Sequence, residues 1–216
     1  MTGVASVLPA RLALFPLTGV LLLPGGVLPL NVFEPRYLAM TDAALGEGRM
    51  IGMIQPLEGK GDAGDPPLYR TGCAGRIVEF RESGDGRYLI NLEGVSRFDV
   101  AEELPKTELF RRARPDWSHY ASDGDDEAEL PGFDASQLVA KLTPFLRRHR
   151  IKADLSAATS VPAVRLVDAV AMMGPFAPAE KQALLEAAPA ERAMLLTKLV
   201  DMALLASSPD TAPARH

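Results

Sequence analysis

LALFPLTGVLLLPGGVLPLNVFEPRYLAM, residues 12–40, is an apolar stretch that prolines and glycines divide into short runs. Short apolar runs between such breakers are typical of strands joined by turns, not of one long helix. The pattern predicts strands over 11–17, 20–23 and 27–33, with a turn at 24–26. Because proline cannot donate to a sheet ladder, the prolines of this stretch are expected at strand ends, edges or bulges.

A helix is predicted to begin at Glu34-Pro35-Arg36, because proline at the first helical position loses no intrahelical hydrogen bond. Ser83–Gly86 carries the composition of a hairpin turn. Further strands are predicted over 50–55, 71–82, 87–93, 95–104 and 109–117. Many short strands without crossover helices favour a closed or semi-closed barrel.

The composition changes after the last predicted strand. Residues 118–132 are acidic and interrupted by glycine and proline, which indicates a linker. Helical spacing of apolar residues follows, with Asp134 and Ser160 as expected caps and Pro178 opening a further helix. The fold class is therefore α+β, and the predicted parts are a β-barrel subdomain (1–117), an acidic linker (118–132), a helical bundle (133–206) and a disordered tail (207–216).

Composition narrows the function classes. A net charge of -5 does not favour general attraction to nucleic acid or anionic membranes. A single cysteine, Cys73, excludes an internal disulfide and indicates a reducing compartment. No signal peptide and no uninterrupted span of roughly 20 apolar residues is found. We therefore expect a cytoplasmic protein.

Four pieces of the sequence occur in an order that resembles the N-terminal substrate-binding domain of ATP-dependent Lon proteases. The most specific piece is Phe33-Glu34-Pro35-Arg36-Tyr37. The others are Leu14-Phe15-Pro16-Leu17, Pro24-Gly25 with Leu28-Pro29-Leu30, and the hairpin pieces Gly72, Gly75-Arg76-Ile77, Gly86-Arg87-Tyr88 and Gly94-Val95-Ser96-Arg97-Phe98. The helical half is also similar, through Glu180–Glu186 and Arg192.

The resemblance implies a PUA-like pseudo-barrel with one inserted helix, followed by a helical bundle, that recognises unfolded or tagged polypeptides. It also implies a bacterial protein related to proteolysis and protein quality control. No GxxxxGK[ST] motif and no GxSxG or HExxH signature is present, so neither ATPase nor peptidase activity is expected. The chain is therefore similar to stand-alone Lon-domain proteins: a non-catalytic polypeptide-binding module that needs no cofactor. Its expected partners are extended polypeptides or one protein, with no membrane and no nucleic acid.

Seven residues are candidates for polypeptide contact: Pro24, Gly25, Gly26, Phe33, Glu34, Arg36 and Tyr37. The Glu34–Arg36 pair could instead anchor the helix start, through backbone groups or Arg97, since buried charges are tolerated only when paired. The glycines of the turn could admit another backbone, although a tight turn explains them as well.

Catalytic and metal sites are not predicted. Cys73 is expected in the core, since the histidines His119, His149 and His216 stand at least thirty residues apart and none follows it closely. Two basic runs, 111–114 and 147–152, keep an RNA-binding barrel open as an alternative, although pairing with the acidic linker explains them more simply. A hydrolase without a recognisable motif is the other alternative.

Overall fold

The computed structural model describes the chain except for residues 1–7, 58–64, 124–129, 157, 159 and 207–216. Two compact units are distinguished: the sheet unit, 1–126 with 177–186, and the helical unit, 127–176 with 187–216. Along the part of the chain described, no helix is both long and apolar enough to cross a membrane. The expected disordered tail, 207–216, lies outside the described residues.

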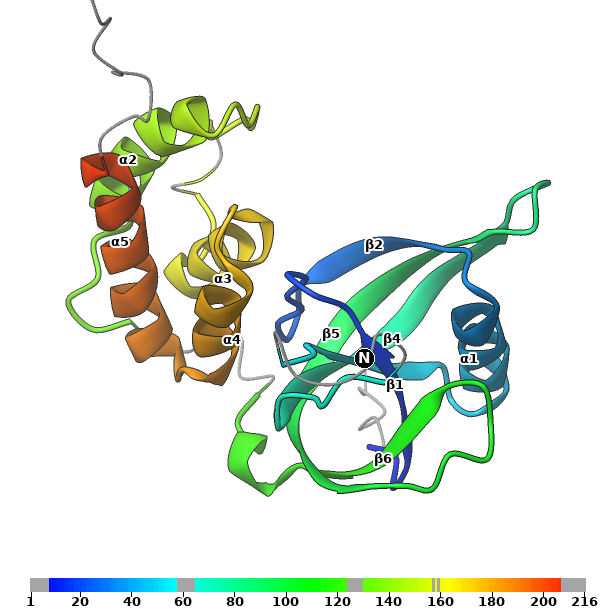
Figure 1. Cartoon of the computed structure of the whole chain (residues 1–216). Helices are drawn as coiled ribbons and strands as arrows, with labels where there is room; N and C mark the ends of the chain where they lie inside the picture. Colours follow the sequence, from blue (N-terminus) through cyan, green and yellow to red (C-terminus); the bar gives the residue numbers. More distant parts are fainter. Residues whose placement is uncertain (1–7, 58–64, 124–129, 157, 159, 207–216) are drawn as a thin grey trace, which may run out of the picture. The chain divides into compact units, whose positions relative to one another are not determined.

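Six strands form the sheet unit, in the order β2-β5-β4-β3-β1-β6. β5 is the longest of them and also pairs with β6, so the pairings among β5, β4, β3, β1 and β6 close into a ring (Figure 1). The strands are β1 (Leu12–Pro16), β2 (Val27–Val32), β3 (Met50–Ile54), β4 (Thr71–Glu82), β5 (Tyr88–Glu103) and β6 (Arg111–Asp116). β1 and β3 run parallel, and every other pairing is antiparallel.

The core of the sheet unit lies inside this ring. Phe98 is fully buried and packs with Leu12, Leu14 and Ile54. Gly52 and Gly72 face the Phe98 ring so closely that a Cβ atom at either position would lie within 3.0 Å of it. The large Phe98 ring therefore fits only because glycine, which has no side chain, stands at positions 52 and 72 of the neighbouring strands.

Two sequence predictions need correction in this unit. The strand predicted over 20–23 is not formed: Leu21–Leu23 are buried in the core, but they join no sheet ladder. The two strands predicted over 87–93 and 95–104 are one continuous strand, β5, with Gly94 inside it. α1 (Pro35–Gly46) begins where predicted, with Pro35 in its first turn.

α4 (Pro178–Glu186) groups with the sheet unit, whereas the sequence placed it in the bundle. Two buried glutamines explain this difference. The Gln182 side-chain amide donates to the Thr71 carbonyl at 3.1 Å, and the Gln55 amide donates to the Pro178 carbonyl at 3.0 Å. These bonds hold the helix on β4 and on the residue that follows β3. The short 3-10 helix η1 (Ser118–Tyr120) also belongs to this unit.

The helical unit contains α2 (Ala135–Arg148), α3 (Ala163–Met173) and α5 (Pro189–Leu205). Asp134 caps α2 as predicted, accepting hydrogen bonds from the backbone N–H groups of Ser136 and Gln137. Ser160 is not the cap of α3, since that helix begins at Ala163. A buried pair, Arg192 Nη1 to Asp168 Oδ1 at 2.7 Å, joins α5 to α3.

Candidate functional site

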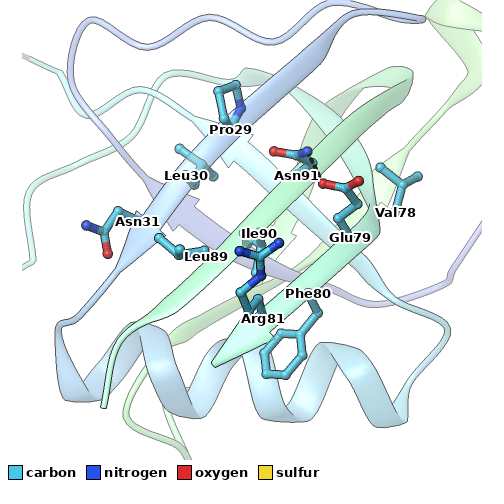
Figure 2. A pocket seen from close by; sticks show the side chains of 10 residues that line it. All are labelled: Pro29, Leu30, Asn31, Val78, Glu79, Phe80, Arg81, Leu89, Ile90 and Asn91. Atoms are coloured by element: carbon cyan, nitrogen blue, oxygen red, sulfur yellow. Dashed lines mark hydrogen bonds between the residues drawn. The ribbon is translucent and has the colours of Figure 1, made fainter. Parts of the chain in front are cut away.

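An open groove lies on the face of three neighbouring strands of the sheet unit, and we call it the sheet-face groove (Figure 2). Its volume is about 730 Å³. It is lined by Pro29, Leu30 and Asn31 of β2, Val78, Glu79, Phe80 and Arg81 of β4, and Leu89, Ile90 and Asn91 of β5.

Strand register explains why apolar and polar groups mix along this groove. One row across the three strands is formed by Pro29, Asn91 and Glu79. A second row, two residues further along each strand, is formed by Asn31, Leu89 and Arg81. Residues two apart on a strand share a face, so these two rows line the same side. The Asn91 amide donates to Glu79 Oε2 at 2.6 Å (Figure 2). Val78, Phe80 and Leu89 are exposed apolar side chains of the same lining.

The exposure of apolar side chains is high here. Val78 is 43% exposed and Leu89 is 41% exposed, although both lie in strands. A shift of register between Ile77 and Glu79 places Val78 at a bulge, an irregularity that re-aims side chains. The sheet-face groove therefore offers apolar contact area next to groups that form hydrogen bonds.

The outer edge of β2 is poorly suited to pairing with another strand. Among the described strands β2 pairs only with β5, so it is an edge strand. Pro29 lies in its middle and has no N–H to offer, which is a common protection of sheet edges. A ligand would find side chains on this face more readily than a free backbone ladder.

A second, smaller cavity has a volume of about 330 Å³, and its lining includes three of the seven predicted site residues, Glu34, Arg36 and Tyr37. Arg36 Nε donates to Glu34 Oε2 at 2.9 Å, and its guanidinium lies 4.5 Å from the centre of the Tyr37 ring. The Tyr37 hydroxyl donates to the Pro16 carbonyl at 3.3 Å, and burial raises the pKa of this tyrosine. Glu34 and Arg36 therefore pair with each other, but Glu34 makes no side-chain cap to α1, Arg97 pairs with Asp123 instead, and the two side chains are 41% and 43% exposed.

Charges around this cavity are neutralised in pairs. Lys106 Nζ lies 2.5 Å from Asp65 Oδ2, and Arg111 forms a two-pronged pair with Glu103 through bonds of 2.6 Å. Arg111 also donates to the Pro66 carbonyl at 2.6 Å. With its cations paired, the cavity has no strong preference for an anion.

The other four predicted residues lie outside both hollows. Gly25 has a φ of 71°, and the turn at 24–26 is hydrogen-bonded to Gly94 of β5 in both directions, at 2.8 Å each. This geometry is that of a tight turn docked on a strand. Phe33 is 61% exposed, and the Arg87 guanidinium lies 5.9 Å from the centre of its ring.

Arg97 does more than the sequence indicated. Its guanidinium forms a buried two-pronged pair with Asp123 at 2.8 and 2.7 Å, and it donates to the Leu185 carbonyl of α4 at 3.0 Å. Burial alone would lower the pKa of Arg97, but the bonds to Asp123 outweigh it and raise that pKa. Asp123 lies in the predicted acidic linker, so the negative charge of that segment was the only sequence feature that pointed to this contact.

The basic run 111–114 does not pair with the acidic linker as expected. Arg112 bonds to Glu47 and Glu108 at 2.6 Å, and Arg114 bonds to Glu102 at 2.5 Å. Glu47 directly follows α1, Glu102 lies on the neighbouring strand β5, and Glu108 lies between β5 and β6. The first basic run is thus neutralised within the sheet unit.

One histidine–carboxylate pair resembles part of a catalytic arrangement. His119 Nδ1 lies 2.8 Å from Asp99 Oδ2, and the Thr71 hydroxyl lies 2.7 Å from Asp99 Oδ1. A nucleophilic hydroxyl has to donate to the histidine, whereas this one donates to the carboxylate. The network therefore joins η1 to the sheet. Cys73 is buried as predicted, and the described residues contain no group of three side chains able to hold a metal.

Comparison with known sequences points to one family. Residues 11–202 match the family model described as the ATP-dependent protease La (LON) substrate-binding domain. Lon protease 2 of Myxococcus xanthus is 28% identical over 141 residues, which are 64% of this chain and 17% of that protein. Lon protease of Methylocella silvestris is 28% identical over 188 residues, 82% of this chain and 22% of that protein. The chain thus spans about a fifth of these relatives' length.

Solved structures show the same fold. The Lon N-terminal domain protein from Xanthomonas campestris has a TM-score of 0.60 at 24% identity and covers 88% of this chain and 97% of that one. The N-terminal domain of Mycobacterium avium complex Lon protease has a TM-score of 0.64 at 16% identity, covering 88% and 98%.

Proposed function

Because the chain belongs to the family of LON substrate-binding domains, we propose that it is a non-catalytic module that binds extended or partly unfolded polypeptide segments. A link to protein quality control and a cytoplasmic location belong to the same proposal. The closed ring of strand pairings supports the expected PUA-like pseudo-barrel as the scaffold.

The observation that carries the proposal is the exposed apolar surface of the sheet-face groove. An exposed apolar side chain in a strand gains free energy when a ligand covers it, at about 25 cal/mol per Å². Val78 and Leu89 offer such contacts, and the polar groups of Asn31 and Arg81 lie within the same lining. Since Pro29 interrupts the edge of β2, contact through this face is favoured over strand addition.

The test uses the full chain and a labelled 20-residue peptide of net charge zero, with Leu, Val and Phe at alternate positions. A second peptide carries Ser at those positions. We expect the apolar peptide to bind more tightly in fluorescence anisotropy, with little dependence on salt. The double variant Val78→Thr/Leu89→Gln should weaken binding about tenfold, which corresponds to about 1.4 kcal/mol of lost contact.

Two controls locate the site. Leu205→Gln changes a leucine of α5 that is 82% exposed, and it should leave binding unchanged. Leu109→Gln changes an exposed residue that lines the smaller cavity beside Tyr37. Loss of binding in Leu109→Gln but not in the groove variant would move the site to that cavity. Equal binding of the apolar and Ser peptides would refute polypeptide capture through apolar contacts.

A further inference from the structure

A second groove, in the helical unit, combines cationic and apolar side chains, and we call it the basic groove. It follows the C-terminal end of α2 and has a volume of about 750 Å³. Its cations are Arg147, Arg150 and Lys152, all exposed, and its apolar members are Leu146, Ile151 and Leu155, all half-buried.

The local backbone explains why these residues face one groove. Ile151 N–H donates to the Leu146 carbonyl at 2.9 Å, and Arg150 N–H donates to the Arg147 carbonyl at 3.1 Å. This pair of bonds is a Schellman motif, which ends a helix and brings the side chains at positions 146 and 151 together. The motif therefore brings Leu146 and Ile151 together in a lining that also contains Arg147 and Arg150.

Arg150 occupies the position of this motif that usually holds glycine. Its φ is 56°, in the left-handed region where a side chain is strained. Glycine would satisfy the turn better, so the arginine is not explained by the fold of this segment. Among the described residues only Arg49 and Arg150 are non-glycine residues with a positive φ, and strained residues of this kind cluster at functional sites.

The cations of the basic groove differ from those of the first basic run. Arg111, Arg112 and Arg114 are all paired with glutamates. In contrast, the side chains of Arg147, Arg150 and Lys152 form no ion pair or hydrogen bond with any residue that the structure describes. The helix dipole stabilises cations in the last helical turn, which accounts for Arg147. It does not account for Arg150 and Lys152, which follow the helix.

The one acidic residue in the lining does not neutralise these charges. Asp154 Oδ1 accepts a hydrogen bond from the Ser156 N–H at 2.9 Å, which caps the turn that follows. The groove therefore presents a net positive charge beside an apolar surface.

We propose that the basic groove is a docking site for an acidic polypeptide segment that also carries apolar side chains. Carboxylates of the partner would pair with Arg150 and Lys152 while a leucine or similar side chain covers Leu146 and Ile151. An acidic peptide fits better than RNA, because the lining contains apolar aliphatic groups and no aromatic ring on which bases could stack. This site lies in the helical unit and does not depend on the sheet-face groove.

The probes are three molecules carrying the same fluorophore: a 16-residue peptide of Glu with Leu at every fourth position, the same peptide with Ser for Leu, and a single-stranded oligouridylate. Each is titrated with the full chain by fluorescence anisotropy at low and at high salt. We expect the Glu/Leu peptide to bind most tightly, with an affinity that falls at least fivefold when Leu is replaced by Ser.

Variants separate binding from folding. Arg150→Gly relieves the left-handed strain, so it should raise the urea midpoint of the helical circular dichroism signal while weakening the Glu/Leu peptide about fivefold. Lys152→Gln should add a similar loss, reaching at least tenfold in the double variant. The matched control Lys198→Gln removes an exposed cation of α5, and it should change neither property.

The outcomes are distinct. Unchanged affinity in Arg150→Gly/Lys152→Gln, or no binding of the Glu/Leu peptide at low salt, overturns the proposal. Tighter binding of the oligouridylate, lost in the same double variant, replaces it with a nucleic-acid site. The Val78→Thr/Leu89→Gln variant should bind the Glu/Leu peptide normally, so failure of the sheet-face groove and failure of the basic groove are told apart.

Discussion

Arg97→Met tests whether one buried guanidinium holds the acidic linker and α4 on the sheet. Methionine keeps an unbranched apolar side chain in place but leaves three acceptors without their donor. The Asp123 carboxylate, 7% exposed, loses its ion pair, and the carbonyls of Leu185 and Glu186 lose bonds of 3.0 and 3.4 Å. The Tyr120 ring also loses the cation 4.5 Å from its centre.

The expected cost is large because one partner of a buried pair is removed alone. Such a change typically destabilises by about 3–5 kcal/mol, against a total stability of about 5–15 kcal/mol. Unfolding in urea can be followed by the fluorescence of Trp117, the only tryptophan, which packs edge-on against Phe98 at 5.7 Å. The probe therefore reports on the sheet unit.

The double variant Arg97→Met/Asp123→Asn provides the decisive comparison. Asparagine removes the unpaired charge and keeps an oxygen for the Arg97 backbone N–H, which donates to Asp123 at 2.8 Å. The double variant should therefore be more stable than Arg97→Met alone, with a coupling of at least about 1 kcal/mol. A cost below about 1 kcal/mol for Arg97→Met, or strict additivity, would refute this account of the contact.

Two further substitutions test the packing of the sheet unit. Gly94→Ala would place a Cβ 2.0 Å from the Leu23 carbonyl oxygen and push the turn at 24–26 off β5, so a loss of about 2–4 kcal/mol is expected in the same urea assay; a neutral effect would show that the turn is not docked in solution. Burial lowers the pKa of Lys181, so between its folded pKa and the unfolded value the unfolded chain binds more protons and stability rises with pH. Wild type should gain stability relative to Lys181→Met as the pH rises through that window, and parallel curves for the two proteins would contradict this reasoning.

Local signals in the sequence predicted much of the fold correctly. Pro35 marks the start of α1 and Asp134 caps α2. The Ser83 hydroxyl closes the turn between β4 and β5: it donates to the Arg87 carbonyl and accepts from the Arg87 N–H. Each of these features depends on residues within four positions of one another. Such signals are readable because the chemistry and the structure lie in the same segment.

Contacts between distant segments were not readable in this way. Gln182 bonds to the Thr71 carbonyl across 111 positions, and this bond decides that α4 belongs with the sheet. Its helical spacing alone is equally compatible with a bundle. The sheet-face groove was also missed, because its exposed leucine and valine depend on the register of β5 with β4 and on the bulge at Val78. An alternating apolar pattern predicts a strand but not whether anything covers it.

The two proposed surfaces share one physical property: each contains residues that depart from a local rule of folding. Val78, Phe80 and Leu89 are exposed apolar side chains on strands of one sheet, and Arg150 holds a backbone conformation that glycine would adopt without strain. Departures of this kind reduce stability, so they need a compensating gain elsewhere, and binding sites are where such gains arise. The paired Glu34 and Arg36 and the docked turn at 24–26 satisfy their local environment instead. Glu34, Arg36 and the turn at 24–26 thus have partners within the fold, and we infer that the residues of the two grooves are the better candidates for contact with partners.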